Sequence, residues 1–243
     1  TRKELVGAYQ KRKQEEITHP DPGEGIFVDA LHEPGKRTIV GRSYAQNGAK
    51  ALDAILSDLA IHPATARHIA TKLVRHFVAD DPPSSLVRKL EADFLRTGGD
   101  LASLYRILIE APESWANTGT KFKTPWEWTV SALRALGVES MPGREQAAVA
   151  LFNQMGQPIW KPGSPKGYGD VAADWAGPAG LMRRVETAGR FAKLAANRVD
   201  ARKLASTIFP GALSPMTAEH IARAERPEQG LALLLVSPEF LRR

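Results

Sequence analysis

The stretch from His62 to Pro83 constrains the fold of this chain more than any other part of its sequence. At 100° per residue its apolar side chains fall on about half of a helical circle, and polar and charged side chains take the other half. Pro63 suits the first turn of a helix, because its missing N–H would have no helical partner there. The run Asp80-Asp81-Pro82-Pro83 ends the pattern, since a proline moves its predecessor out of the α region. The stretch therefore predicts an amphipathic core helix over residues 63–79.

Similar signals predict helices along most of the remaining chain, at 47–60, 84–97, 101–111, 125–137, 143–155, 178–198, 200–207, 215–225 and 227–236. Asp100, which follows Gly98-Gly99, is a natural N-cap for one of them. A β signal comes from residues 26–28 and 38–40, which flank a Pro34-Gly35 pair suited to a type II turn. We expect a mainly α-helical protein of about ten helices in a bundle-like array, with one short β-hairpin.

The pattern indicates one helical domain over 1–243. Its expected parts are a helix end and linker at 1–24, a hairpin at 25–42, a helical core at 43–155, an ordered Gly/Pro/aromatic loop at 156–178 and C-terminal helices at 179–243. The chain opens without a methionine or a signal-like apolar region, so we expect it to be part of a larger protein.

Composition excludes several classes of site. The absence of cysteine excludes disulfides, thiolate zinc sites and a cysteine nucleophile. No window approaches the roughly 18 apolar residues that a membrane span needs. The net charge of +6 permits an anionic partner, but no nucleic-acid reader motif accompanies it, so nucleic-acid binding is disfavoured. No serine nucleophile elbow, phosphate-binding loop, zinc-protease helix or dinucleotide fingerprint is present, so no metal or cofactor is predicted.

A first candidate ligand site involves charged residues around 121–134. Glu127, Ser131 and Arg134 are spaced i, i+4 and i+7, so they share one stripe of the predicted 125–137 helix. Lys121 and Lys123 enter just before it. These groups suit either an anionic ligand or an internal ion-pair network that holds helices in register, and we favour the network.

The aromatic loop supplies a second candidate. Trp160, Tyr168 and Trp175, with Trp126 or Trp128, suit a stacking platform for a sugar or a peptide, because aromatic faces offer large contact areas with a polar handle. The same side chains are also what an irregular loop needs to hold it in place. We favour that second interpretation. Gln157, at the start of the same loop, is a further candidate ligand residue, and its convergence with Glu127, Arg134 and Tyr168 on a deep pocket would favour an enzyme.

Six further residues stand out by their positions in motifs: His62, Thr65, Lys72, Asp80, Asp81 and Asp100. His62 at a helix start favours capping or packing over catalysis. Asp80 and Asp81 offer oxygen ligands for a hard cation, but without calcium-loop spacing they indicate helix termination. Lys72 shares a helical face with two histidines, which is typical of a solvated surface.

The chain resembles the bacterial "domain of unknown function eighteen-hundred" family, as the C-terminal portion of a member, over about residues 25–243. The resemblance is carried by motifs in the expected order, strongest from His62 to Pro83. The others are Phe27, His32-Glu33, Gly35-Lys36, Gly41, Gly99-Asp100, Lys121 to Glu127, Arg134 to Gly137, Gly156 to Pro158, Pro165 to Tyr168, Trp175, Arg184 and Ser237 to Phe240.

No activity, cofactor or catalytic residue comes with this resemblance. It implies an exported protein, in the periplasm or outside the cell, and a partner encoded by a neighbouring gene from an exported, sulfatase-like family. Our first hypothesis is a non-enzymatic exported or envelope protein that binds a partner protein or an acidic glycan. The alternative is a hydrolase or metal-dependent enzyme with a site near Glu127, Arg134 and the 156–178 loop; nucleic-acid binding is a weaker third option.

Overall fold

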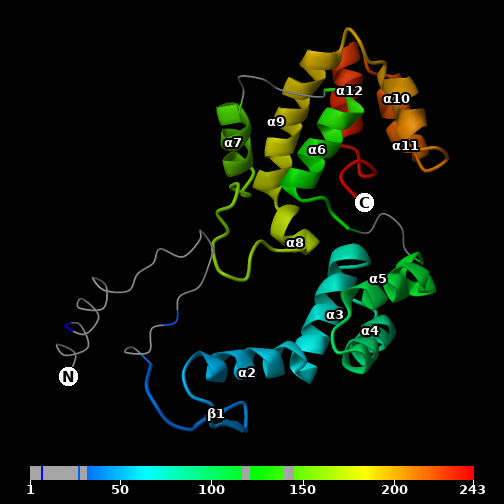
Figure 1. Ribbon diagram of the computed structural model, residues 1–243. Helices are drawn as coiled ribbons and strands as arrows, with labels where there is room; N and C mark the ends of the chain where they lie inside the picture. The colour runs from blue at the N-terminus through cyan, green and yellow to red at the C-terminus, as the bar shows by residue number, and fades with distance from the viewer. Residues whose placement is uncertain (1–6, 8–26, 28–31, 117–120, 139–144) are drawn as a thin grey trace. The chain divides into compact units, whose positions relative to one another are not determined.

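The computed structural model describes residues 7, 27, 32–116, 121–138 and 145–243 (Figure 1). Eleven α-helices and one two-stranded antiparallel sheet lie in these residues, which confirms the predicted mainly helical class with a short hairpin. The predicted helix end and linker at 1–24 lie outside the described residues, apart from Gly7. None of the helices in the described ranges is long and apolar enough to cross a membrane.

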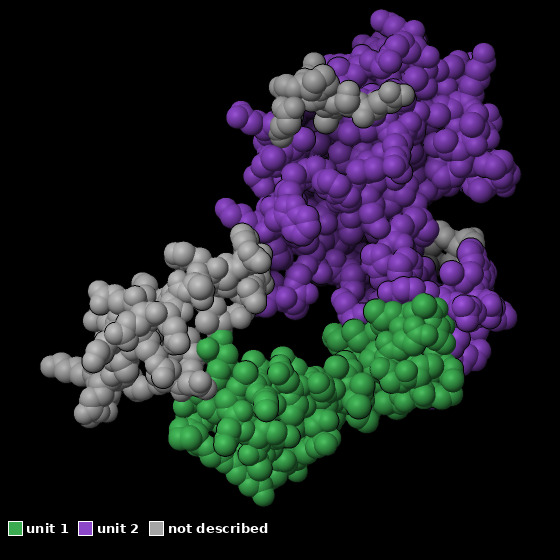
Figure 2. All heavy atoms as spheres, in the orientation of Figure 1, with its two compact units in different colours: residues 1–69, 90–104 green, residues 70–89, 105–243 purple. Residues whose placement is uncertain are grey.

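The chain divides into two compact units, which Figure 2 shows in different colours. Unit 1 contains Thr1–Ile69 and Leu90–Leu104, and unit 2 contains Ala70–Lys89 and Tyr105–Arg243. The division passes through three helices: α3 (Pro63–Phe77), α4 (Ser84–Thr97) and α5 (Leu101–Glu110). The expected single domain stays a prediction.

Helix α3 begins at Pro63, as its sequence predicts, and its first turn is capped locally. His62 Nδ1 accepts a hydrogen bond from the Ala64 N–H (3.1 Å), so the histidine ring acts as an N-cap. The Thr65 hydroxyl donates to the Leu59 carbonyl (2.7 Å) near the end of α2 (Ala49–Ala60), which fixes the α2–α3 corner. These contacts confirm the capping interpretation of His62.

The hairpin lies at 37–44, which corrects the predicted boundaries of 25–42. Strand β1 (Arg37–Ile39) pairs with β2 (Arg42–Tyr44) in antiparallel register, with Ile39 opposite Arg42. The turn is Val40-Gly41, with φ of 47° and 77°, and not Pro34-Gly35. Two-residue turns with both φ values positive match the right-handed twist of the strands, so they close hairpins better than a type II turn. The other expected strand, 26–28, lies outside the described residues apart from Phe27.

The boundary between α4 and α5 follows the glycines and Asp100. Gly98 and Gly99 both have positive φ, and a Cβ on Gly99 would approach the Phe94 ring to 3.2 Å. Asp100 Oδ1 then accepts the Ala102 N–H (3.0 Å), which confirms the predicted N-cap of α5. After α5, a short 3₁₀ turn, η2 (Pro112–Ser114), carries the chain onward.

The core of unit 2 is built by α6 (Pro125–Ala135), α9 (Pro178–Ala195) and α12 (Pro227–Leu235), which run side by side in Figure 1. The smaller helices α7 (Glu145–Gln154), α10 (Ala201–Ile208) and α11 (Pro215–Ala222) complete it. Trp128 is fully buried at its centre, where the ring stacks on Phe191 with centroids 6.0 Å apart. Its indole N–H donates to the Leu235 carbonyl (2.9 Å), so α6 and α12 are joined in the core.

The end of the chain pairs with the segment that precedes α6. Phe122 and Arg242 form an antiparallel bridge, and the Lys123 N–H donates to the Leu241 carbonyl (2.8 Å). This pairing brings Arg243 to the start of α6. The expected irregular loop at 156–178 differs in one respect, because it contains a one-turn helix, α8 (Ala172–Trp175).

Candidate functional site

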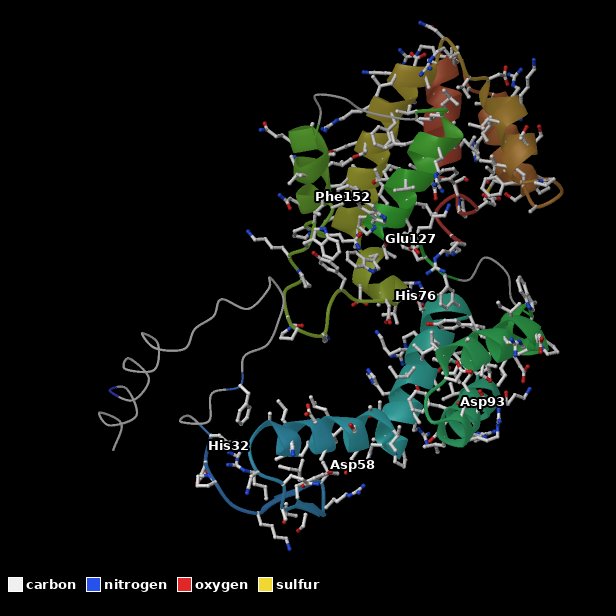
Figure 3. All side chains as sticks on the ribbon, in the orientation of Figure 1. His32, Asp58, His76, Asp93, Glu127 and Phe152 are labelled. Atoms are coloured by element: carbon white, nitrogen blue, oxygen red, sulfur yellow. The ribbon has the colours of Figure 1, made fainter. Side chains whose placement is uncertain are left out.

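Glu127 lies in the first turn of α6 (Figure 3). Both of its carboxylate oxygens are engaged. Glu127 and Thr124 form a capping box: Glu127 Oε2 accepts the Thr124 N–H (2.8 Å), and Thr124 Oγ1 accepts the Glu127 N–H (3.2 Å). Glu127 Oε1 lies 2.7 Å from Arg243 Nε. Arg243 also donates to the carbonyl of His76 (3.0 Å), near the end of α3. Glu127 therefore stabilises a junction between the C-terminus, α6 and α3.

Lys121 is the centre of a second group of charges. It is only 3% exposed, forms an ion pair with Asp80 and also donates to the backbone carbonyl of Asp170. The second carboxylate oxygen of Asp80 accepts the Ala172 N–H (2.6 Å). Lys72 forms an ion pair with Asp170 (2.5 Å). These residues, from α3, its following turn, the segment before α6 and the loop before α8, make one continuous network.

The protonation of Asp170 follows from its place in that network. Burial raises the pKa of its carboxyl, but the hydrogen bond and charge of Lys72, with the charges of Arg75 and Lys121, outweigh burial and hold the pKa below its ordinary value. Asp170 is therefore held as a carboxylate paired with lysine. Of the residues in the network that the sequence favoured, Lys121 joins this group, Glu127 pairs with Arg243, and Arg134 is exposed.

Lys123 and Arg184 lie against aromatic rings beside the network. The Arg184 side chain is 1% exposed, lies 4.6 Å from the Phe122 ring centroid and donates to the Lys123 carbonyl (2.8 Å). The Lys123 ammonium lies 4.4 Å from the Phe240 ring centroid. Burial lowers the pKa of Lys123 to about 8, with Glu127 opposing and Arg184 adding to the change, and burial lowers that of Arg184 to about 10.

Two of the three aromatic side chains in the loop hold it together. Trp175 is buried, and its indole N–H donates to the Gly169 carbonyl (3.1 Å). Gly169 permits this close packing, because a Cβ there would overlap the Asp174 side chain at 2.1 Å. Tyr168 packs on Trp175 with ring centroids 6.3 Å apart. Both side chains serve the loop itself.

Trp160 is different, because it is 94% exposed in a strained backbone conformation. It lies in a turn in which the Lys161 N–H donates to the Pro158 carbonyl (3.3 Å), and its φ is +54°. Glycine and asparagine are the residues that favour this third position of a turn. The Tyr168 hydroxyl donates to the Pro158 carbonyl and accepts from the Lys161 N–H (3.2 Å), so Tyr168 closes the turn that presents Trp160.

The loop segment that carries Trp160 is basic, and it is tied to an aromatic residue at the start of α6. Lys161 and Lys166 are exposed, and residues 156–168 contain no carboxylate. Gln157 Oε1 accepts the N–H of Trp126 (2.8 Å), which fixes the loop to the start of α6. The Trp126 ring packs on Phe152, with centroids 5.0 Å apart, and remains 51% exposed. We call this surface, made by Trp126, Trp160, Lys161 and Lys166, the presented-tryptophan surface.

The remaining residues singled out from the sequence do not join these groups within unit 2. His62, Thr65 and Asp100 belong to unit 1, where each caps or fixes a helix end. Asp81 and Arg134 are exposed. Among the described residues, no cluster of three or more His, Cys, Asp or Glu side chains is placed to hold a metal ion.

Sequence reasoning missed an apolar groove of about 500 Å³ in unit 2, lined by Leu73, Phe77, Val78, Tyr105, Leu108, Ile109, Ser114 and Trp115. Phe77 belongs to the apolar side chains of the predicted 63–79 core helix, but it is 57% exposed in this groove. Helical periodicity shows which face of a helix is apolar, but it does not show whether another element packs on that face. The pattern therefore cannot distinguish an open groove from a buried core. The only sequence signal for the groove is Pro112, which ends α5 and starts the turn that carries Trp115.

Comparison with known proteins gives a family without a known activity. A family model described as "Protein of unknown function (DUF1800)" matches residues 9–242. This match confirms the resemblance carried by the motifs and extends it towards the N-terminus. No curated protein and no solved structure matches the chain.

Proposed function

The chain belongs to the DUF1800 family, and we propose from its own geometry that it is a non-enzymatic protein that binds acidic glycans. The observation that carries this proposal is the exposure of Trp160 in a left-handed backbone conformation. A non-glycine residue in this conformation destabilises the folded state by about 1–3 kcal/mol. An exposed indole offsets little of that, because it buries little apolar surface. Such strain concentrates at functional sites.

The chemistry of the presented-tryptophan surface selects the ligand class. Indole faces stack on the apolar faces of sugar rings, and lysine ammonium groups bind carboxylate or sulfate substituents. Trp126 and Trp160 provide the rings, while Lys161 and Lys166 provide charge without a neighbouring acid in residues 156–168. An acidic polysaccharide satisfies both components, whereas a neutral sugar uses only the rings.

The contacts of the other candidate residues support binding over the hydrolase alternative. A hydrolase site at this place would need Glu127, Gln157 and Tyr168 to face a substrate. Instead, Glu127 caps α6 and pairs with Arg243, Gln157 binds the Trp126 N–H, and the Tyr168 hydroxyl binds the loop backbone. These three polar groups are committed to the fold, and Arg134, the fourth residue of that alternative, is exposed.

Affinity electrophoresis of the chain through gels that contain polygalacturonate tests this proposal. We expect retardation by polygalacturonate and little by its methyl-esterified form, which has the same backbone without the charge. The double variant Lys161→Gln/Lys166→Gln should lose most of the retardation. A matched variant, Lys193→Gln/Lys203→Gln, removes the same charge from exposed sites on α9 and α10 and should keep it.

Equal retardation by the charged and esterified polymers would contradict the acidic-glycan proposal. So would equal effects of the two double variants, because binding would then follow net charge and not the presented-tryptophan surface. Stronger retention by DNA than by polygalacturonate would favour the nucleic-acid alternative instead.

The apolar groove favours a second candidate function, binding of a partner protein through an amphipathic helix. Phe77, Ile109 and Trp115 are exposed along it. The Trp115 indole N–H donates to the Ile109 carbonyl (2.8 Å), and the Ser114 hydroxyl donates to the Leu108 carbonyl (2.6 Å). Because these polar atoms are already used, the groove suits a helix, whose backbone satisfies itself, better than an extended peptide.

Pull-down with the exported, sulfatase-like product expected from a neighbouring gene tests this second candidate. Retention by the wild type and loss with Ile109→Asp would support it, and equal retention by both would contradict it. Location outside the cytoplasm is part of the same proposal, and fractionation of cells that express the full-length protein tests it. Recovery in the cytoplasm would contradict that part.

A further inference from the structure

A second cavity lies in unit 1, at the corner between the hairpin, α2 and the start of α3. It has a volume of about 240 Å³, and its walls include Val40, Arg42, Tyr44, Asp58, Ile61 and His62. All of these residues belong to unit 1, and Figure 3 shows Asp58 on α2. An engineered cavity of about 150 Å³ holds benzene, so this one has room for about ten non-hydrogen atoms.

The charges of the cavity are arranged around Asp58. Arg42 Nη1 lies 2.7 Å from Asp58 Oδ1, and the buried Tyr44 hydroxyl also hydrogen-bonds to Asp58. Burial, reinforced by that hydrogen bond and by the charge of Asp58, raises the pKa of Tyr44, so it remains a donor. Asp58 is thus balanced by two donors from β2. The Arg42 guanidinium carries five N–H groups, more than one carboxylate oxygen uses.

The hydrogen bond at Nδ1 of His62 determines which ring nitrogen can donate to a ligand. Its Nδ1 accepts the Ala64 N–H, so the neutral ring carries its proton on Nε2. The start of α3 adds little by itself, because Pro63 has no N–H and the Ala66 N–H bonds to the His62 carbonyl (3.0 Å). Recognition of a ligand in this cavity therefore depends on the side chains of Arg42 and His62.

The apolar wall contains a strained residue. Val40 has φ of +47° and is 67% exposed at the hairpin turn. A β-branched residue is a clear outlier there, and asparagine is the residue that such turns prefer. Gly41 readily adopts one of the two positive φ values of the turn, but nothing in the hairpin itself explains a valine at the other. Ile61, also exposed, provides a second apolar side chain at the same cavity.

We propose that this cavity binds a carboxylate attached to a short branched apolar group, with Arg42 and His62 on the carboxylate and Val40 and Ile61 on the apolar group. The Arg42 cation, the His62 N–H donor and the aliphatic wall together match this chemistry, and the volume fits a carboxylate with one short branched side chain. The same chemistry is offered by a free branched-chain acid and by the C-terminal residue of a peptide.

NMR titration of the full chain, followed through the Val40 and Ile61 methyl groups, tests the proposal with 4-methylpentanoate and its amide as probes. We expect saturable shifts with the acid and none with the amide. Arg42→Gln should weaken binding about tenfold to a hundredfold, as expected for a charge-assisted pair. Lys36→Gln removes a charge at an exposed position just before β1 and should leave binding unchanged.

Two further variants separate binding from folding. His62→Ser keeps an acceptor that caps α3 but removes the Nε2–H, and we expect about fivefold to tenfold weaker binding. Val40→Asn places the preferred residue in the turn, so it should raise the melting temperature while weakening binding about tenfold. Equal binding of the acid and amide, or unchanged binding by Arg42→Gln and Val40→Asn, would overturn the proposal.

An acetyl-Gly-Gly-Leu peptide and its C-terminal amide distinguish the two sources. Tighter binding of the peptide acid than of 4-methylpentanoate would support the proposal with a chain terminus as ligand. Tighter binding of 4-methylpentanoate would support it with a free acid. Failure of both acids to saturate would overturn it.

Discussion

Lys121, buried in unit 2, forms its ion pair with Asp80, a residue 41 positions earlier in the turn that follows α3. The same ammonium group reaches the Asp170 carbonyl, so one lysine joins three segments of the chain. Asp80 therefore does more than terminate a helix: it neutralises a buried cation and fixes the Ala172 N–H.

Asp80→Asn tests the energetic importance of this pair. It leaves the buried Lys121 charge without a carboxylate, so we expect a loss of about 2–4 kcal/mol in the free energy of unfolding, measured by urea denaturation. Arg223→Gln is the control, because its pair with Glu219 (2.6 Å) is exposed and should contribute less than about 1 kcal/mol. Equal effects of the two variants would contradict the importance of the network.

The lowered pKa of Glu239 predicts that the folded state loses stability in acid. Burial raises the pKa of this carboxyl, but hydrogen bonds from Ser214 and Thr217 outweigh burial and lower the pKa from 4.5 to about 2. Because the folded pKa is below the unfolded one, the contribution is full above pH 4.5 and is lost as pH falls towards 2. Glu239→Gln should lower the melting temperature at pH 7, and the difference should disappear near pH 2. A constant difference across this range would contradict the assignment.

The lowered pKa of Lys123 predicts that the folded state gains stability as pH rises into the alkaline range. Its folded pKa of about 8 is below the ordinary 10.5, so holding the charge costs stability below pH 8, and the cost disappears as pH rises to 10.5. Lys123→Met should therefore raise the melting temperature at pH 7 and have less effect at pH 10. A lower melting temperature at pH 7 would show that the contact with the Phe240 ring outweighs burial.

Tyr168→Phe tests the closure of the Trp160 turn. The change removes the hydroxyl that bridges Pro158 and Lys161 but keeps the ring on Trp175. We expect a loss of about 1 kcal/mol in the free energy of unfolding and weaker retention by polygalacturonate. Unchanged retention would mean that the turn holds Trp160 without Tyr168.

The helices were largely predictable from sequence because their punctuation is local. Pro63 starts α3, Asp100 caps α5 and Pro125 starts α6, each at the residue that the pattern indicates. The hairpin turn was not predictable, because Val40 is unfavourable in a turn of positive φ while Pro34-Gly35 looks favourable. The turn preferences of single residues therefore indicated a turn at Pro34-Gly35, whereas the hairpin turns at Val40-Gly41.

The contacts of the candidate site depend on pairings that spacing cannot reveal. Glu127 and Arg134 share a predicted stripe, yet Glu127 pairs with Arg243 at the other end of the sequence, and Arg134 is exposed. Trp160 and Trp175 occur in one loop, yet one is presented to solvent and the other is buried. Their difference comes from the backbone partners that the folded loop supplies, and composition carries no information about those.

The measurement that tests the central claim most directly is the paired stability and glycan affinity of Trp160→Asn. Asparagine tolerates positive φ, so the variant should be as stable as the wild type or up to about 1 kcal/mol more stable. Isothermal titration with polygalacturonate should show at least about tenfold weaker binding, because stacking on the indole is lost. Trp115→Ala, which removes another exposed indole outside the loop, should bind normally. Unchanged affinity of Trp160→Asn, or a clear loss of stability, would contradict the account, because Trp160 would then serve the fold and not a ligand.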